Sequence, residues 1–345
     1  MPPGGPPDAA APQLVAVIPD SGTVGVSPKE VIFRFDEVVA ERPPAATTLS
    51  DLFLISPRDG SPKVSWHRSA IGVRPRRGWR PNTAYSVIML PGIADIRGNV
   101  RNTGASTFFS TGRTIPRTRL AGRVFDWVAG TPAKGALVES FVSPDSLHPY
   151  IALTDSNGAF AMLHLPPARY SVRAYIDANK NLGIDQSELW DSVSTTLTDS
   201  ASATLLIFKH DSLPPRIRDV SVVDSLSLRL SFDRPLDPSQ TLTVANFSVI
   251  GPDSVAVPIV SFTASAAVQD TVKPVMPRRA PSSEVVIKLQ RQLAAGTTYR
   301  VRAIGLRGIL GHTGDSERPY TTPAPAPPLA PKPGVPPPAA PVIKQ

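Results

Sequence analysis

Short stretches in which apolar and polar residues alternate recur along the whole chain, and this period of two predicts β-strands. Residues 30–39 place Val31, Phe33 and Phe35 on one face, and residues 84–90 alternate in the same way. Segments rich in Pro, Gly, Asn and Asp separate these stretches, as expected for turns between strands. No helical period of about 12 residues or more is present. We therefore expect an all-β chain.

The predicted strands form three groups, which we interpret as tandem β-sandwich modules. The first module spans residues 14–113, the middle module 120–211 and the third module 215–320. Residues 1–13 are rich in Pro, Gly and Ala and predict a flexible leader. Residues 321–345 contain ten prolines and predict an extended polyproline tail, which we expect to be solvated rather than bound to a partner.

The first and third modules share sequence features in the same order. This internal similarity indicates a duplicated sandwich with a different module inserted between the two copies. The shared positions are strand cores and turns. The matching segments are 31–39 with 228–236, 52–57 with 246–251, and 81–99 with 295–311.

Charge and composition favour three separate modules over one nucleic-acid-binding body. The net charge of +8 divides into +6 for residues 1–119, −4 for residues 120–213 and +6 for residues 214–345, so we expect no nucleic-acid partner. The 40 prolines disfavour long helices, and the absence of cysteine excludes disulfides, thiolate metal sites and a cysteine nucleophile. No apolar run approaches the ~20 residues of a membrane span, and no signal peptide follows Met1.

The first module resembles the bacterial Ig-like domain of the SbsA/Big_5 type, and the third module looks like a diverged copy of it. The residues that carry the resemblance are PQLVAVIPDSGTVGVSPKEVIFRFDEVV (12–39), RPNTAYSVIML (80–90), GIADIRGN (92–99) and FFSTG (108–112). The resemblance implies an Ig-like β-sandwich for both modules.

The middle module resembles the carboxypeptidase regulatory-like, transthyretin-like module. The residues concerned are GRVFDW (122–127), GALV (135–138), LTDSNGAFAM (153–162) and LPPARYSVRAYIDANKN (165–181). Ala168 departs from the family, which usually has Gly before this strand, so we expect a slightly different turn. The three modules behind a GGPPD leader are similar to bacterial Ig-like surface lipoproteins, in which a lipid-bearing Cys commonly precedes the leader. Either this chain begins downstream of the true start, or the protein has no lipid anchor.

The stretch from Asp177 to Glu188 approximates the calcium-loop pattern D-x-[DN]-x-[DN]-G-x5-E. Calcium prefers roughly six to eight oxygen ligands. The predicted ligands are Asp177, Asn179, Asn181, the carbonyl of Gly183, Asp185 and Glu188. Leu182 stands where the pattern has Gly, and the flanks are β rather than helical, so an EF-hand is excluded. A bound calcium ion would stiffen the loop; the alternative is a polar turn, which Asp and Asn favour without a metal.

Residues 63–80 place six cations around two tryptophans. They are Lys63, Arg68, Arg74, Arg76, Arg77 and Arg80, with Trp66 and Trp79. One interpretation is a ligand site in which the tryptophans and the four arginines at positions 74–80 bind an anionic glycan, a lipid headgroup or nucleic acid. We favour the other interpretation, in which the arginines are solvated and the tryptophans pack in or over the core.

The sequence has no HExxH, GxSxG, P-loop or GxGxxG motif, and its five histidines lie far apart. We therefore expect no enzyme, but a non-catalytic, extracytoplasmic cell-envelope protein that acts as a scaffold or as an adhesion and binding protein. Its partners would be envelope proteins or surface glycans, and a membrane only through an N-terminal lipid anchor. The alternatives are a carbohydrate or anionic-glycan binding protein that uses the Trp66 and Trp79 face, and an accessory subunit of an envelope enzyme.

Overall fold

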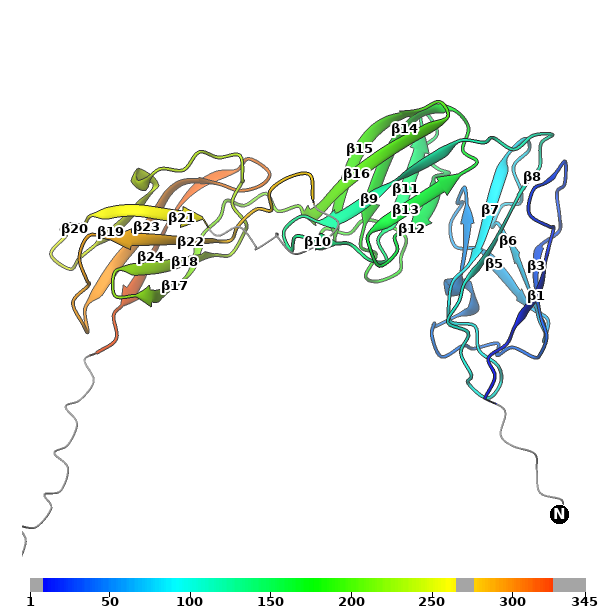
Figure 1. Ribbon diagram of the computed structural model, residues 1–345, viewed down its shortest axis with the longest axis horizontal. Helices are drawn as coiled ribbons and strands as arrows, with labels where there is room; N and C mark the ends of the chain where they lie inside the picture. The colour runs from blue at the N-terminus through cyan, green and yellow to red at the C-terminus, as the bar shows by residue number, and fades with distance from the viewer. Residues whose placement is uncertain (1–8, 265–275, 325–345) are drawn as a thin grey trace, which may run out of the picture. The chain divides into compact units, whose positions relative to one another are not determined.

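The computed structural model describes residues 9–264 and 276–324, and their regular structure is almost entirely β (Figure 1). Within these residues the helices are two 3-10 turns, η1 (Leu49–Leu52) and η2 (Val244–Asn246). The predicted all-β class of tandem sandwich modules is confirmed. None of the described helices is long and apolar enough to cross a membrane. Most of the predicted leader (1–13) and Pro-rich tail (321–345) lies outside the described residues.

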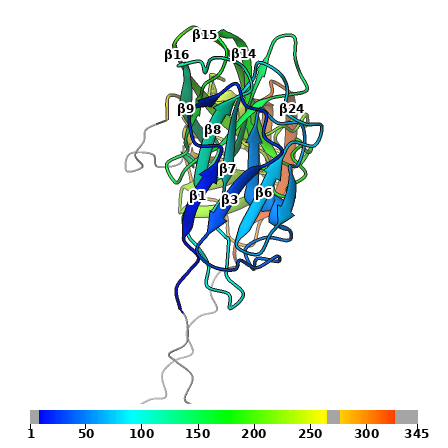
Figure 2. The same ribbon diagram turned by 90° about the vertical axis from the view of Figure 1, so that its right-hand side faces the viewer.

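The first module is a sandwich of two four-stranded sheets (Figures 1 and 2). Its strands are β1 (Leu14–Ile18), β2 (Thr23–Val24), β3 (Val31–Phe35), β4 (Phe53–Ser56), β5 (Lys63–Trp66), β6 (Ala70–Arg74), β7 (Ala84–Met89) and β8 (Ala105–Ser110). One sheet has the order β1-β3-β6-β5, and the other has the order β2-β8-β7-β4. The predicted inward residues meet in one core, where Phe33, Tyr85 and Phe109 are buried together. Alternation alone therefore identifies the core face of these strands.

The middle module has eight strands joined in one continuous ladder. They are β9 (Arg119–Asp126), β10 (Thr131–Pro132), β11 (Leu137–Val142), β12 (Tyr150–Leu153), β13 (Ala159–Leu163), β14 (Ala168–Tyr175), β15 (Leu189–Leu197) and β16 (Ser200–Lys209). The order is β10-β9-β16-β15-β14-β11-β12, with β13 also paired to β9. Tyr170, Val172 and Ala174 alternate along β14, point inward and are fully buried. The assignment of this module as transthyretin-like stays a prediction.

Residues 155–158 read Asp-Ser-Asn-Gly between two apolar stretches, which is a hairpin signal, and they form a turn, but its flanking strands do not pair with each other. Asp155 accepts the backbone N–H groups of Asn157 and Ala159 at 2.8 and 2.9 Å, and Gly158 adopts a φ of +68°. However, β12 pairs with β11, whereas β13 pairs with β9. The turn therefore connects two strands that pair with different partners. Sequence alternation does not show this, because a period-two pattern does not specify which strand a segment pairs with.

The third module repeats the two-sheet arrangement. Its strands are β17 (Ile217–Asp224), β18 (Ser227–Phe232), β19 (Phe247–Ile250), β20 (Ala256–Val257), β21 (Ile259–Ala264), β22 (Glu284–Leu289), β23 (Thr298–Arg307) and β24 (Thr313–Thr321). The sheets have the orders β17-β18-β22-β21 and β20-β19-β23-β24. Leu226, Leu228, Leu230 and Phe232 alternate in sequence, a pattern that predicts an inward face. Leu228, Leu230 and Phe232 lie in the core, while Leu226 precedes the strand and is only half-buried.

Matching hydrogen bonds in the first and third modules support the predicted duplication. The Tyr85 hydroxyl accepts the N–H of Arg80 at 2.8 Å, and the Tyr299 hydroxyl accepts the N–H of Ala294 at 3.0 Å, five residues upstream in each case. Such a tyrosine corner is characteristic of Ig-like sandwiches. Further matching contacts are Thr83–Thr111 with Thr297–Thr322, and Gln13–Asp36 with Arg216–Asp233.

The chain divides into two compact units. Residues up to 211, which include the first and middle modules, belong to one unit, and most of the third module forms the other. The first and middle modules therefore share a junction within one unit. The ends of the three predicted modules stay a prediction.

Gly122 lies where β9 has no room for a side chain. A Cβ at this position would be 1.8 Å from the carbonyl oxygen of Ala203 on β16 and 2.9 Å from the Phe160 ring. We expect Gly122→Ala to push β9 and β16 apart and to lower the free energy of unfolding by about 1–3 kcal/mol, the usual effect of overpacking. Denaturant titration followed by circular dichroism measures the change. Ala161→Ser, at an exposed position of β13, is the control. An unchanged midpoint in Gly122→Ala would contradict this packing.

Candidate functional site

The loop from Asp177 to Glu188 connects β14 to β15 and is held by its own acidic side chains. Asp177 accepts the backbone N–H groups of Asn181 and Leu182, both at 3.0 Å. Glu188 is buried, and each of its two oxygens accepts a backbone N–H of the loop. The carboxylates therefore fix the backbone of the loop, as Asp side chains commonly do in turns.

Leu182 makes the sharp turn for which the calcium-loop pattern has glycine. Its φ is +60°, and that of Lys180 is +59°, so both residues lie in the left-handed region that L-residues disfavour by about 1 kcal/mol or more. The two hydrogen bonds that Asp177 accepts from the Asn181 and Leu182 N–H groups hold this conformation. One result is that the Leu182 carbonyl is available to a partner outside the loop, Arg58.

The side-chain oxygens of this loop are used within the loop itself. Asp185 accepts the side-chain NH₂ groups of Asn179 and Asn181 at 2.6 and 3.0 Å, so both amides turn a nitrogen toward it. The Asn181 oxygen accepts the Gly183 N–H at 2.7 Å. Among the described residues, no three His, Asp or Glu side chains are grouped as a metal site. This arrangement does not fit a calcium ion unless the side chains turn, and calcium binding stays a prediction.

The two tryptophans of the basic stretch lie in different surroundings. Trp79 is half-buried and packs edge-on against Tyr85 and Phe109, with ring-centroid distances of 4.9 and 5.0 Å. Trp66, at the end of β5, is 38% exposed. Trp66 is therefore the more exposed of the two rings, and Trp79 packs against the core of the first module.

The arginines of the same stretch also have separate surroundings. Arg74 pairs with Glu30 at 3.5 Å, whereas Arg80 pairs with an aspartate of the middle module at 3.1 Å. Arg76 and Arg77 are exposed. The arginines of the predicted basic face therefore lie in three different places: at the strand edge, in the solvent and at the junction with the middle module.

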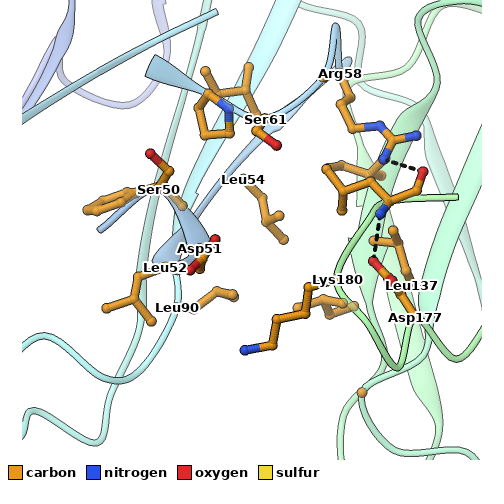
Figure 3. Close-up of a pocket in the computed structure, with 18 of the residues that line it drawn as sticks. Ser50, Asp51, Leu52, Leu54, Arg58, Ser61, Leu90, Leu137, Asp177 and Lys180 are labelled. Carbon is orange, nitrogen blue, oxygen red and sulfur yellow. Dashed lines mark hydrogen bonds between the residues drawn. The ribbon is translucent and has the colours of Figure 1, made fainter. Parts of the chain in front are cut away.

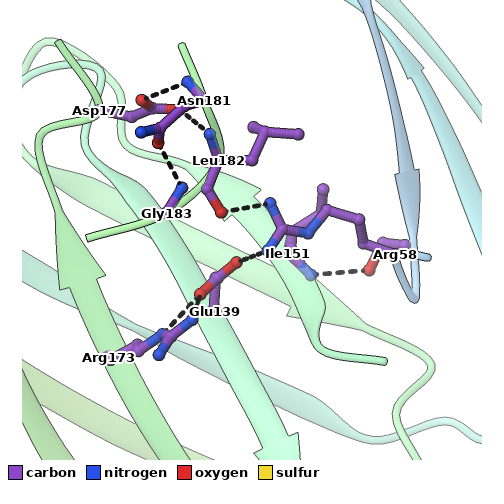
Figure 4. Close-up of polar contacts among 9 residues, drawn as sticks. Arg58, Glu139, Ile151, Arg173, Asp177, Asn181, Leu182 and Gly183 are labelled. Carbon is purple, nitrogen blue, oxygen red and sulfur yellow. Dashed lines mark hydrogen bonds and ion pairs between the residues drawn. The ribbon is translucent and has the colours of Figure 1, made fainter. Parts of the chain in front are cut away.

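A buried carboxylate on β11 marks the place where the first and middle modules meet (Figure 4). Glu139 is fully buried, and its two oxygens pair with different arginines. Arg58, which follows β4 in the first module, donates to one oxygen. Arg173 of β14 donates to the other from Nε and Nη2, both at 2.6 Å. Arg58 also donates to the Leu182 carbonyl at 3.1 Å, so the Asp177–Glu188 loop belongs to the same network.

Backbone groups bind the same two segments together. The N–H of Arg58 donates to the Pro149 carbonyl at 2.8 Å, and the N–H of Ile151 donates to the Ser56 hydroxyl at 2.9 Å. Ser56 ends β4, and Ile151 lies in β12. Because hydrogen bonds are directional, these contacts fix the position of β4 against β12 more closely than apolar packing alone.

Apolar side chains are buried beside the Arg58–Glu139 pair, in which Glu139 is fully buried and Arg58 is 12% exposed. Leu137, Ile151 and Tyr175 face away from the middle module's own core, yet they are at most 3% exposed. Leu54 of β4 packs on this cluster. The outward face of such a sheet is usually solvated, so its burial here results from the junction. The low dielectric strengthens the Arg58–Glu139 attraction, and it makes an unpaired charge at this place unfavourable.

A second ion pair crosses the junction nearer the solvent. Asp145 contacts Arg80 and the His148 ring, each at 3.1 Å. Burial favours the neutral carboxyl, but the Leu147 N–H, the His148 ring and Arg80 together outweigh it and lower the pKa of Asp145. The carboxylate is therefore charged at neutral pH. Its exposure to solvent limits its contribution to stability.

Sequence reasoning missed Arg58 and Glu139. Glu139 interrupts the otherwise apolar and small-residue strand Leu137–Val142, and a carboxylate buried in such a strand requires a cation. That signal was present in the sequence. Its partner was not identifiable, because Arg58 lies 81 residues earlier in another module.

A substitution at Asp177 tests whether its carboxylate holds the loop and whether the loop binds calcium. We expect Asp177→Ala to lower the melting temperature, because it removes the acceptors for two backbone N–H groups and loosens the Leu182 contact with Arg58. The calcium prediction adds that the unaltered protein melts at a higher temperature in millimolar calcium than in chelator, and that Asp177→Ala abolishes this difference. Asp199→Ala, at an exposed carboxylate outside the loop, is the control. Equal melting temperatures of the unaltered protein in calcium and chelator would exclude calcium.

Comparisons with solved structures show distant likenesses. The N-terminal part of the bacterial S-layer protein SbsC is 26% identical over 33% of this chain and 25% of that chain, with a TM-score of 0.25. A DUF3823 family protein from Bacteroides uniformis is 14% identical over 60% of this chain and 100% of that chain, with a TM-score of 0.20. An L,D-transpeptidase from Mycobacterium smegmatis is 16% identical over 53% and 76% of the two chains, with a TM-score of 0.21. With scores this low, these likenesses carry no argument about function.

The comparison with protein families is more specific. No curated protein matches the chain. A family model described as a bacterial Ig-like domain, Big_5, matches residues 8–111. This range covers both sheets of the first module, β1 to β8. The first module therefore matches the bacterial Ig-like domain family, Big_5, over its whole length.

Proposed function

We propose that the chain is a non-catalytic, extracytoplasmic cell-envelope protein in which the first and middle modules act as one stiff structural element. The observation that carries this proposal is the buried carboxylate of Glu139, which pairs with Arg58 of the first module and with Arg173 of its own module. Contacts between modules of one chain are commonly polar and allow relative motion. Here, separation of the modules would leave Glu139 without Arg58 and would expose the apolar cluster around Leu137. Both effects oppose bending at this junction.

The Big_5 domain supports the placement in the envelope and a structural or binding role. Ig-like sandwiches are rigid carriers that are reused for many purposes, so the fold alone does not choose a partner. Other envelope proteins are the partners that a stiff multi-module chain would connect. An accessory role beside an envelope enzyme remains a variant of the same proposal.

A second candidate function is saccharide binding, and a groove on the middle module favours it. A hollow of about 680 Å³ lies on the outer face of β14 and β15, beside the junction. Phe141, Trp190 and Arg173 line it together with Ser171 and Ser192. Sugar rings present C–H faces to aromatic side chains and hydroxyl groups to polar ones, and this lining offers both. We place the glycan in this groove rather than at the Trp66 and Trp79 face because the groove combines aromatic and polar side chains.

Spin labels on the cysteine-free chain test the stiff junction. Cysteines introduced at the exposed positions Val15 and Ser194 report the distance between the first and middle modules. We expect a narrow distance distribution that broadens in Arg58→Met, because this variant keeps the apolar stem and removes the charge that compensates Glu139. Arg42→Met, at an exposed position, should leave the distribution narrow. A broad distribution before any substitution at Arg58 would contradict the proposal.

A polysaccharide array tests the second candidate. Binding should be lost in Trp190→Ala and retained in Trp66→Ala, since only the first ring lines the groove. Trp190 stacks on His210 with a centroid distance of 3.8 Å, so circular dichroism must show that Trp190→Ala is folded. The reverse result would move the site to the basic stretch. An array without any signal would remove saccharide binding as a candidate.

A further inference from the structure

The connection between β21 and β22 in the third module is much longer than its counterpart in the first module. The corresponding sheets have the same strand order, in which β21 and β22 take the places of β5 and β6. Residues 67–69 join β5 to β6, whereas residues 265–283 join β21 to β22. The first module shows that a short connection closes this sandwich. Connections longer than about 12–15 residues are uncommon in compact domains and usually have a function or act as linkers.

The described part of this connection contacts the middle module. Residues 267–280 belong to the same compact unit as the middle module, although β21 and β22 belong to the other unit. Met276 and Ala280 are only 8% and 1% exposed. They form an apolar cluster with Phe125 of β9 and Leu206 of β16. The segment therefore packs on a module to which it is not adjacent in sequence.

The surface beneath this segment is the outer face of the middle module. Along β16, Leu205 and Ile207 fill the module's own core, whereas Leu206 and Phe208 alternate with them and point outward. Phe208 packs edge-on against Trp127 with a centroid distance of 5.5 Å. The outer face of a sheet that is packed on one side is usually polar. This face is apolar instead, as expected of a surface that is covered in the folded protein.

A hydrogen bond fixes the position of the segment on this face. Trp127, which follows β9, donates its indole N–H to the Arg279 carbonyl at 3.0 Å. Apolar contacts are not directional, whereas this bond has a defined geometry. The residues between Met276 and Ala280 are exposed, so the two buried side chains and the bonded carbonyl together define one docked position.

We propose that residues 276–280 are an anchor that attaches the third module to the outer face of the middle module. The backbone at residues 211–212 already joins the two units, and the anchor adds a second attachment through the connection between β21 and β22. Residues 281–283 alone separate the anchor from β22, so a docked anchor restricts the movement of the third module. The proposal concerns a different pair of modules from the Arg58 network and does not depend on it.

Thiol labelling of the cysteine-free chain tests whether the anchor covers this face. The thiol in Leu206→Cys should react slowly, and adding Met276→Asp should accelerate the reaction by about tenfold or more, because an unpaired carboxylate is unfavourable in an apolar contact. Met276→Leu keeps an apolar side chain and should leave the reaction slow. Ala174→Cys, in the core of the middle module, should stay unreactive beside Met276→Asp, which separates undocking from unfolding.

Spin labels test whether the anchor restricts the third module. Cysteines at the exposed positions Ser194 and Val255 report the distance between the middle and third modules. Met276→Asp should broaden this distance distribution, and Met276→Leu should not. The distribution between Val15 and Ser194 should be the same in both variants, so a failure of the anchor is distinguishable from a failure of the stiff junction at Arg58.

Three results would overturn the anchor. One is labelling of Leu206→Cys that Met276→Asp does not accelerate, and another is a Ser194–Val255 distribution that Met276→Asp leaves unchanged. The third is protection of residue 206 that is lost on dilution, since a second copy of the chain would then supply the segment. Should Met276→Asp also make the Ala174→Cys thiol reactive, Ala280→Asp tests the same contact from the other end of the anchor.

Discussion

A carboxylate buried in a β-strand must be compensated by positive charge, and in this protein part of that charge comes from another module. Glu139 is fully buried between Arg173 of its own module and Arg58 of the neighbouring one. Removal of one partner from such a group is strongly unfavourable, while the complete network adds little stability beyond that of an apolar contact. The network therefore acts mainly by specifying one arrangement of the two modules rather than by making either of them more stable.

The role of the Asp177–Glu188 loop follows from this arrangement. The loop resembles a metal site in sequence, but its carboxylates hold backbone N–H groups and keep Leu182 in a left-handed conformation. That conformation presents the Leu182 carbonyl to Arg58. The loop's hydrogen bonds thus stabilise the strained backbone of Leu182. Leu182 in turn places its carbonyl oxygen at the junction as an acceptor. A calcium ion would add stiffness to a loop that already has this structural task.

The strands and their core faces were predictable because alternation depends on neighbours in sequence. The spacing of Val31, Phe33 and Phe35 favours one environment, the buried face of a β-strand. The duplicated sandwich also preserves the tyrosine corner, at Tyr85 and Tyr299. The junction was not predictable in the same way. Leu137 and Tyr175 lie on a face that alternation assigns to solvent, and their burial depends on a strand from another module. Trp79 packs against the core of the first module, in keeping with the interpretation that the sequence favoured over a ligand face.

The same contacts that hold the modules together also explain why they do not close completely. Hydrogen bonds from Arg58 and Ile151 are directional, so they fix β4 against β12 at a set spacing. Apolar side chains farther from these bonds cannot approach more closely without breaking them. Leu52 and Leu90 therefore face Leu153 across a space instead of a packed interface. Polar groups therefore specify one side of the junction, and the side chains at the other side do not pack fully against each other (Figure 3).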